Sequence, residues 1–252
     1  HKEYRRQRQM CIRDRLGAEI GNAPSRVGAV MPVAPFGFPI DTLAWDKFRS
    51  RTGIPVVIDA AAAFDTIRPG LVPSVVSLHA TKVLGVGEGG VIASRDVELI
   101  KDLRARCNFG FFQSREARMP ATNAKMSEYH AAVGLAALDA WDQTRDEWIS
   151  VAEYYRCALE GSNRIRFQDG FGSKWITATC VISVDEAGAD RVESALNAER
   201  IETRRWWGRG AHDHPATRPL PRSTLPSTEV LAQSTIGLSL IHISEPTRPE
   251  RI

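Results

Sequence analysis

The stretch SLHATKVLGVGEGGVIAS, residues 77–94, decides how the rest of the chain is interpreted. An apolar run with strand character is followed by a serine, a histidine and one lysine, Lys82, and four glycines then surround a glutamate. Most lysines in turns are simply solvated. A lysine at the junction of a strand and a glycine loop also suits an amine held at a site. The rest of the sequence must show whether Lys82 is a solvated lysine or an amine held at a site.

The glycines of this stretch suggest a second hypothesis. Gly85, Gly87 and Gly90 match the pattern G-x-G-x-x-G, which binds dinucleotides when a strand precedes it and a helix follows it. Here the glycines are followed by VIAS, which has strand character. The pattern therefore disfavours a nucleotide loop.

The first half of the chain alternates short apolar strands with helices. The expected strands cover residues 27–37, 56–59, 74–79 and 89–94, and the expected helices cover 39–53 and 95–107. This alternation predicts an α/β protein with a mostly parallel sheet that is buried on both faces. In the first helix, Leu43 and Phe48 are expected to face inward, and Gly53 to end the helix.

The second half predicts a smaller α/β unit. Apolar residues recur at helical spacing along residues 145–159; they are Trp148, Val151, Ala152, Tyr155 and Leu159. Two strand-like pieces with a helix between them follow. We expect residues 17–144 to be the C-terminal part of a large domain and 145–240 to be a small C-terminal domain.

Composition excludes several classes of protein. The net charge is only +3, and much of it lies in the first nine residues, so no basic face indicates nucleic-acid binding. No apolar run is long enough to span a bilayer. The four cysteines lack CxxC spacing, which is typical of reduced thiols in a cytoplasm.

Both ends of the chain differ from what lies between them. Residues 1–16 and 241–252 have no period that matches their neighbours, and they resemble translated sequencing-adapter sequence. We expect both to be non-native tails that do not belong to the fold.

One cofactor suits the candidate residues. Asp59 ends the strand VVID, and open α/β sheets bind ligands at the carboxyl ends of such strands. Lys82 follows a strand that is a candidate neighbour of the first. An amine, a carboxylate, a serine hydroxyl and glycine amides match the needs of pyridoxal phosphate, namely a Schiff base, a partner for the ring nitrogen and donors for the phosphate.

Three stretches carry a family resemblance. VVIDAAAAFD, SLHATKVLGVGEGG and NAKMSEYHAAVGLAALD occur in an order that resembles the DegT/DnrJ/EryC1/StrS sugar aminotransferases over about residues 27–240. The resemblance implies the aspartate-aminotransferase fold, fold type I of the pyridoxal phosphate enzymes, incomplete at both ends.

By resemblance, Lys82 holds pyridoxal phosphate and later moves the proton. Asp59 keeps the ring nitrogen protonated, and Ser77 binds the phosphate. Asn123 matches the family asparagine that reaches the phosphate of the neighbouring subunit, which implies a homodimer with shared active sites.

Two histidines have a less specific resemblance. His79 and His212 correspond to residues on the substrate side, although a purely structural role fits them as well. His212 and His214 form an H-x-H pair without a third ligand, so no metal site is expected.

The chain also departs from the family pattern. Ala62 stands where glutamine is common, and Lys125 where arginine is common. The upstream helix start that holds the phosphate and the aromatic residue that stacks on the ring have no counterpart, and the small domain is expected to be cut short. This fragment is therefore expected to be inactive by itself.

The resemblance implies an enzyme that moves an amino group from glutamate onto a nucleotide-linked keto-deoxysugar, for surface polysaccharide or a glycosylated metabolite. The related sugar dehydratases replace the lysine by histidine, whereas Lys82 is present. A non-catalytic or regulatory relative that keeps only the fold is the alternative from another class. A nicotinamide oxidoreductase, supported only by the glycine pattern, ranks third.

Overall fold

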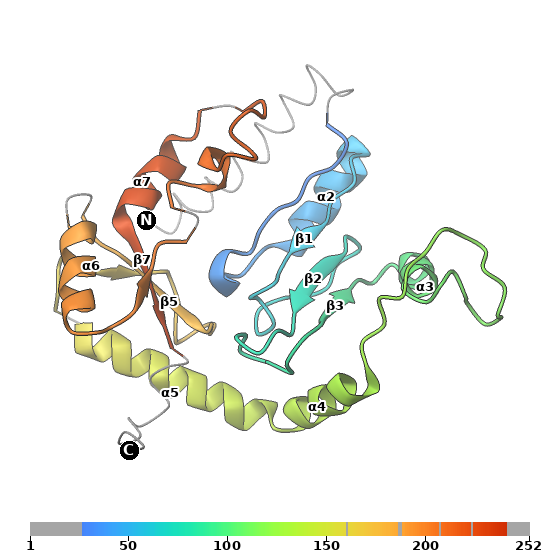
Figure 1. Ribbon diagram of the computed structural model, residues 1–252, viewed down its shortest axis with the longest axis horizontal. Coiled ribbons are helices and arrows are strands. Elements are labelled where there is room, and N and C mark those ends of the chain that lie inside the picture. The colour runs from blue at the N-terminus through green and yellow to red at the C-terminus, as the bar shows by residue number, and fades with distance from the viewer. Residues whose placement is uncertain (1–26, 160, 186–187, 207, 223, 241–252) are drawn as a thin grey trace. The chain divides into compact units, whose positions relative to one another are not determined.

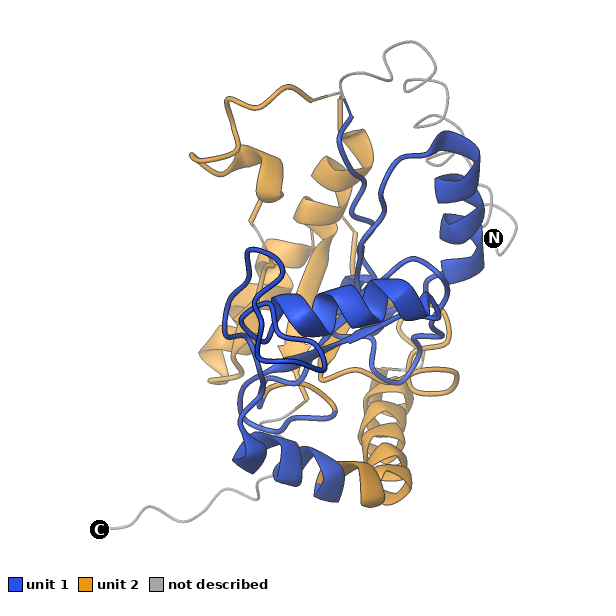
Figure 2. Ribbon diagram, turned by 90° about the vertical axis from the view of Figure 1, so that its right-hand side faces the viewer, with its two compact units in different colours: residues 1–80, 84–136 blue, residues 81–83, 137–252 orange. Residues whose placement is uncertain are grey.

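The computed structural model describes residues 27–159, 161–185, 188–206, 208–222 and 224–240. The expected tails at 1–16 and 241–252 lie outside the described residues. The chain forms two compact units, whose elements are shown in Figures 1 and 2. Unit 1 contains residues up to 80 and 84–136, and unit 2 contains 81–83 and the residues from 137 onward.

Unit 1 contains a sheet with the strand order β1-β2-β3. The strands are β1 (Ile58–Asp59), β2 (Ser74–Ser77) and β3 (Gly90–Ala93). β1 and β2 are parallel, and isolated parallel bridges join Val30 to Val56 and Val33 to Asp59. The expected strand at 27–37 is thus limited to bridges, and it ends in the 3-10 helix η2 (Pro35–Gly37).

β3 runs antiparallel to β2, which limits the expected parallel order to one side of the sheet. The chain between these strands turns back directly, since the Leu78 N–H donates to the Gly89 carbonyl at 3.0 Å. A parallel return needs a crossover connection, so a direct return of this kind gives an antiparallel neighbour.

Helix α2 (Thr42–Thr52) covers one face of this sheet. The Asp41 carboxylate accepts a hydrogen bond from the Ala44 N–H and caps the start, and Gly53 ends the helix with a φ of 70°. Phe48 is buried as expected, together with Trp45, against strand residues that include Ile58. Leu43 is 64% exposed, so the expectation that it faces inward is wrong. The core lies on the Trp45–Phe48 side of the helix.

The opposite face of the sheet is open. Asp59, Val75 and Ile92 are in register across the three strands, so they point to the same face. Val75 is 39% exposed and Ile92 is 40% exposed, and Val57, two residues before Asp59, is 38% exposed. Among the described residues this face of the sheet is therefore largely exposed, contrary to the expectation that both faces are buried.

Two further helices complete unit 1. Helix α3 (Val97–Arg106) begins at Asp96, whose carboxylate accepts a hydrogen bond from the Leu99 N–H. Helix α4 (Glu128–Asp139) is rich in alanine and leucine, and none of its residues is buried. The division between the units falls at residues 136 and 137, within α4.

The first helix that lies wholly in unit 2 is the long helix α5 (Trp141–Leu159). Its apolar stripe is confirmed, since Ala152 is buried and the other four residues of the stripe are partly buried. The antiparallel sheet has the order β4-β5-β7-β6, from strands at Arg166–Phe167, Thr179–Ser183, Thr235–Ser239 and Thr203–Arg204. Helices α6 (Ala189–Ala198) and α7 (Pro226–Ser234) and the 3-10 helix η3 (Ala211–Asp213) complete the unit.

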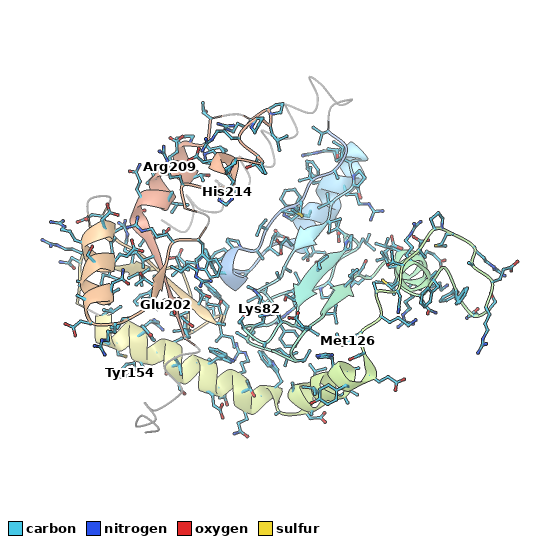
Figure 3. All side chains as sticks on the ribbon, viewed as in Figure 1. Lys82, Met126, Tyr154, Glu202, Arg209 and His214 are labelled. Carbon is cyan, nitrogen blue, oxygen red and sulfur yellow. The ribbon has the colours of Figure 1, made fainter. Side chains whose placement is uncertain are left out.

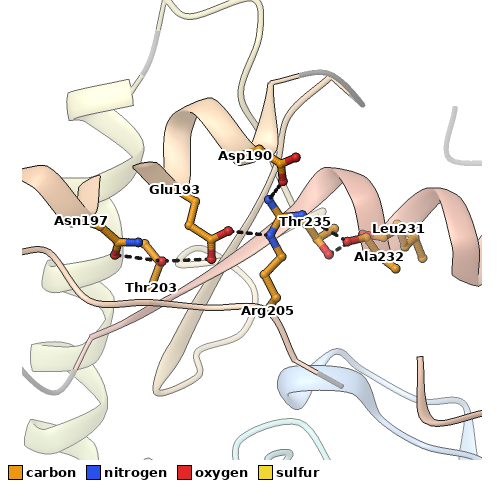
Figure 4. A network of polar contacts seen from close by, with 8 residues as sticks. All are labelled: Asp190, Glu193, Asn197, Thr203, Arg205, Leu231, Ala232 and Thr235. Carbon is orange, nitrogen blue, oxygen red and sulfur yellow. Dashed lines mark hydrogen bonds and ion pairs between the residues drawn. The ribbon is translucent and has the colours of Figure 1, made fainter. Parts of the chain in front are cut away.

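A polar network ties the end of β6 to helices α6 and α7 of unit 2 (Figure 4). Arg205 has a side chain that is only 20% exposed; its Nη2 lies 2.5 Å from Asp190 Oδ1 and its Nε lies 3.0 Å from Glu193 Oε2. Its Nη1 donates to the Ala232 carbonyl at 3.5 Å. Two carboxylates on α6 thus hold one largely buried guanidinium group at the end of β6, as expected for a charge withdrawn from water.

No helix in the described part of the chain is both long enough and apolar enough to cross a membrane.

Candidate active site

The ends of β1 and β2 bring two predicted site residues to one edge of the sheet. Asp59 ends β1 and Ser77 ends β2, and the two strands are parallel neighbours. The Ala61 backbone joins them, because its N–H donates to Asp59 Oδ1 at 3.0 Å and its carbonyl accepts from the Ser77 N–H at 3.3 Å. A carboxylate and a hydroxyl therefore lie at the carboxyl edge, where open α/β sheets bind ligands.

The Asp59 side chain is partly buried, and one of its oxygens is occupied. Oδ1 holds the turn after β1 through the Ala61 N–H. No hydrogen bond or ion pair to Oδ2 is found among the described residues. This second oxygen is available to a cationic group of a ligand.

Ser77 and His79 form a compact turn after β2. Ser77 Oγ accepts the His79 N–H at 3.2 Å, which leaves the hydroxyl hydrogen able to be donated to a ligand. The His79 ring lies with Nε2 3.6 Å from Glu88 Oε1, and both side chains are substantially exposed. Glu88 thus lies close to the imidazole that follows the predicted phosphate ligand, a pairing that the sequence pattern did not indicate.

Lys82 lies in the loop between β2 and β3 (Figure 3). The base of this loop is closed by hydrogen bonds from the Leu78 N–H to the Gly89 carbonyl at 3.0 Å and from the Ala80 N–H to the Gly87 carbonyl at 2.8 Å. The lysine is half-buried, and its segment, 81–83, belongs to unit 2. There Trp148 Nε1 donates to the Val83 carbonyl at 3.3 Å and holds the segment on α5.

The glycines of the loop make room for the start of α4. A Cβ atom on Gly87 would lie 3.0 Å from the His130 ring, and one on Gly89 would lie 2.9 Å from Met126 Cε. Both glycines also have positive φ, 104° and 130°. The strand β3, and no helix, follows them, which confirms that this is not a dinucleotide loop.

The sequence showed the spacing of these residues but not their contact. Gly87 and Gly89 are two residues apart, and Met126 and His130 are four apart, which places the latter pair on one side of a helix start. Nothing in the sequence indicated that the two pairs meet.

Asn123 is exposed on a separate loop of unit 1 that leads from α3 to α4. An antiparallel bridge pairs it with Asn108 on the other arm of the loop. Lys125, two residues further on, donates from Nζ to Asn108 Oδ1 at 2.8 Å and lies 4.5 Å from the centre of the Phe109 ring. These contacts brace the arm that carries Asn123.

His212 belongs to unit 2, in η3. Its ring packs on Gly210, where a Cβ atom would lie 2.7 Å from both Cε1 and Nδ1. No group of three or more histidine, cysteine or acidic side chains in the described parts of the chain is arranged to hold a metal ion. Asp59, Ser77 and His79 thus cluster within unit 1, whereas Lys82 and His212 are part of unit 2.

Comparison with known proteins assigns the chain to a protein family. A sequence model of the DegT/DnrJ/EryC1/StrS aminotransferase family matches residues 18–250. The chain belongs to this family. The matched range covers Asp59, Ser77, Lys82 and Asn123, and it also runs into the C-terminal segment that was expected to be non-native.

Three relatives illustrate the likeness. Protein MT3510 of Mycobacterium tuberculosis (strain CDC 1551 / Oshkosh) is 32% identical over 217 residues, which are 82% of this chain and 52% of that protein. The dTDP-4-amino-4,6-dideoxy-D-glucose transaminase of Shigella dysenteriae is 34% identical over 139 residues, which are 52% of this chain and 38% of the transaminase. The crystal structure of DesI, determined in the presence of its TDP-sugar product, has a TM-score of 0.73 and 31% identity, and the match covers 85% of this chain and 57% of DesI.

The structural neighbours are pyridoxal-phosphate-dependent sugar aminotransferases of fold type I, which confirms the expected fold. The chain spans only about half the length of these relatives. It matches 52% of MT3510 and 57% of DesI. Pyridoxal phosphate is the cofactor of these aminotransferases.

The residues of unit 1 fit parts of this cofactor. The free Oδ2 of Asp59 suits a protonated ring nitrogen, and the Ser77 hydroxyl suits a phosphate oxygen. The amine that the cofactor also needs is present in Lys82, in the loop that follows β2.

Proposed function

We propose that the chain is the part of a pyridoxal-phosphate-dependent aminotransferase that carries the Schiff-base lysine and the ring-nitrogen acid. The observation that carries this proposal is the placement of Asp59 and Ser77 at one edge of the parallel pair β1 and β2. Lys82 follows the second of these strands in a chain that belongs to an aminotransferase family.

Each of the three residues has a distinct task in this proposal. When bound, pyridoxal phosphate supplies an electron sink for the carbon that gains or loses the amino group. The Asp59 carboxylate keeps the ring nitrogen protonated, since an adjacent negative charge favours the charged form of a base. Ser77 donates its hydroxyl hydrogen to the phosphate. Lys82 attaches the cofactor through Nζ and then moves a proton with the same amine.

The acceptor in this proposal is a nucleotide-linked keto-deoxysugar, and the donor is glutamate. The names of relatives support the substrate class, because the Shigella protein is a dTDP-sugar transaminase and DesI was solved with a TDP-sugar. We further propose that the product enters a surface polysaccharide or a glycosylated metabolite. The reaction is placed in the cytoplasm, in line with the free cysteines Cys107, Cys157 and Cys180.

The functional unit is proposed to be a homodimer in which Asn123 of one subunit binds the phosphate held by its partner. Asn123 is exposed, and it lies on an arm that Lys125 braces through Asn108 and Phe109. An exposed amide on a braced arm is suited to reach a neighbouring subunit, because little order has to be gained on binding.

Activity is proposed to need more polypeptide than these 252 residues. The sheet of unit 1 presents Val57, Val75 and Ile92 to solvent on its open face, whereas sheets with parallel strands are normally covered on both faces. The phosphate also carries close to two negative charges, which demand several donors. Ser77 supplies one of them, and the chain matches only 52% of MT3510.

A non-catalytic relative that keeps only the fold is the second candidate. The observation that favours it is Ala62, which stands where a glutamine is common in the family.

Amino transfer by a polypeptide extended upstream to the length of the relatives separates the two candidates. The aminotransferase proposal expects amino transfer to a dTDP-linked keto-sugar, with complete loss in Lys82→Ala and no loss in Lys101→Ala, an exposed lysine on α3. Turnover that persists in Lys82→Ala contradicts the mechanism, and the absence of turnover in the folded wild type with bound cofactor favours the non-catalytic candidate.

A further inference from the structure

The segment between β6 and α7 contains an excess of positive charge. Residues 204–222 include five arginines and a single acidic residue, Asp213. Two of the arginines have other partners. Arg205 is held by Asp190 and Glu193 on α6, and Arg204 lies 3.8 Å from Glu202 and over the Trp206 ring.

The remaining three, Arg209, Arg218 and Arg222, form what is called here the arginine cluster. Arg209 Nε lies 3.7 Å from Asp213 Oδ2, and Arg218 Nη2 lies 3.3 Å from Asp213 Oδ1. The Asp213 carboxylate therefore lies between two guanidinium groups, with one near each of its oxygens. Arg222 joins them through a hydrogen bond from Nη1 to the Arg218 carbonyl at 2.7 Å. Figure 3 labels Arg209 in this segment.

The backbone that carries the cluster is well braced although it has little regular structure. The N–H groups of Thr217 and Arg218 both donate to the His214 carbonyl, at 3.0 and 2.8 Å. Arg218 Nη2 donates to the Asp213 carbonyl at 2.8 Å, and Thr217 Oγ1 donates to the Ala211 carbonyl. Three prolines, at 215, 219 and 221, restrict the same segment. The backbone that carries the cluster and the Arg218 side chain are thus braced before any ligand arrives.

The cluster is also open to solvent. The side chain of Arg209 is 83% exposed, and that of Arg218 is 60% exposed. A guanidinium group has five N–H donors in a planar fork that matches phosphate oxygens, and the contacts to Asp213 use only some of them. Three guanidinium groups against one carboxylate leave a surplus of two positive charges. Arg205 pairs with two carboxylates on α6, so it leaves no surplus of positive charge, and it stabilises the fold instead.

We propose that the arginine cluster binds the diphosphate group of a nucleotide-linked substrate. A diphosphate that bridges a nucleoside and a sugar carries two negative charges, which equal the surplus of the cluster. Its neighbouring phosphates offer oxygens to two guanidinium groups at once, and charge-assisted, forked hydrogen bonds of this kind are the strong ones. The choice of a nucleotide-sugar as the source of the diphosphate rests on the proposed function.

Titration of the 15N-labelled chain with dTDP, followed by NMR, tests the proposal without requiring turnover. Inorganic pyrophosphate and dTDP are expected to shift the Arg209 and Arg218 side-chain signals, and thymidine, which lacks phosphate, is expected not to. Arg209→Gln and Arg218→Gln should each weaken dTDP binding roughly three- to tenfold, as the loss of one exposed charge-assisted contact implies. The matched control Arg191→Gln, an exposed arginine on α6, should change the affinity by less than about twofold.

Two further arms identify the ligand and guard against misfolding. Pyridoxal phosphate should bind through the cluster more weakly than dTDP, because it offers a single phosphate; equal or tighter binding assigns the cluster to the cofactor and overturns the proposal. The double variant Arg209→Lys with Arg218→Lys keeps the charge and should retain part of the affinity.

The proposal is overturned if neither dTDP nor pyrophosphate binds, or if the two Gln variants bind like Arg191→Gln. Failure of the proposed function looks different, because dTDP then still binds through the cluster while no amino transfer occurs in the extended polypeptide.

Discussion

Substitution of Gly87 by alanine tests whether the loop between β2 and β3 depends on its contact with α4. Gly87 has a φ of 104°, and a Cβ atom there would lie 3.0 Å from His130 Cδ2 and Nε2. The backbone conformation alone costs on the order of 1–3 kcal/mol for a residue other than glycine. The His130 ring cannot move freely, because its Nδ1 lies 2.7 Å from Ser127 Oγ, and breaking that hydrogen bond costs about 1 kcal/mol more.

The expected loss in the free energy of unfolding is therefore about 2–4 kcal/mol for Gly87→Ala, measured by urea denaturation. Gly161 offers a matched control, since its φ is 102° but nothing lies within 4 Å of an added Cβ atom. Gly161→Ala should cost only the backbone part. The double variant Gly87→Ala with His130→Ala should recover about 1 kcal/mol of coupling. Equal losses at the two glycines, without coupling to His130, would refute the inferred contact.

Three other substitutions test separate parts of the account. Burial raises the pKa of the Cys180 thiol to about 12, and burial also raises the pKa of Tyr155 to about 12. As the pH rises, these groups lose their protons in the unfolded chain before they do so in the folded chain. The free energy of unfolding should therefore be constant below about pH 9 and fall above it, and it should fall less steeply in Cys180→Ala. A flat profile would show that neither group is held neutral. Ser74 Oγ is buried without a hydrogen-bond partner among the described residues, so Ser74→Ala should leave the free energy of unfolding unchanged or raise it by about 1 kcal/mol, and a clear loss in urea denaturation would reveal a hidden partner. Asp59→Asn in the extended polypeptide should slow the half-reaction by orders of magnitude with the melting temperature nearly unchanged, whereas an unchanged single-turnover rate would make Asp59 structural.

Local patterns explain what the sequence predicted well. Gly53 ends α2 because a left-handed φ favours glycine, and the stripe on α5 follows from helical spacing alone. The parallel pairing of β1 and β2 follows from two short apolar strands separated by a connection long enough for a crossover. These features depend on residues close to one another in the chain.

The features that sequence reasoning missed depend on distant residues. Leu43 and Phe48 are both apolar members of one helix, and only the position of the strands decides which of them is buried. The open sheet face could not be anticipated, because Val75 and Ile92 have the composition of buried strand residues. Met126 and His130 likewise contact the glycine loop from a segment about 40 residues further along the chain, and only the fold brings the two together.

Identification of the lysine that holds pyridoxal phosphate tests the central claim most directly. The extended polypeptide would be loaded with the cofactor and reduced with borohydride, which fixes the pyridoxyl group to its lysine, and the peptides would be mapped by mass spectrometry. We expect one pyridoxyl group per chain, on Lys82, with none on the exposed lysines Lys101 and Lys125. Labelling spread over several lysines, or carried by a lysine other than Lys82, would contradict the account.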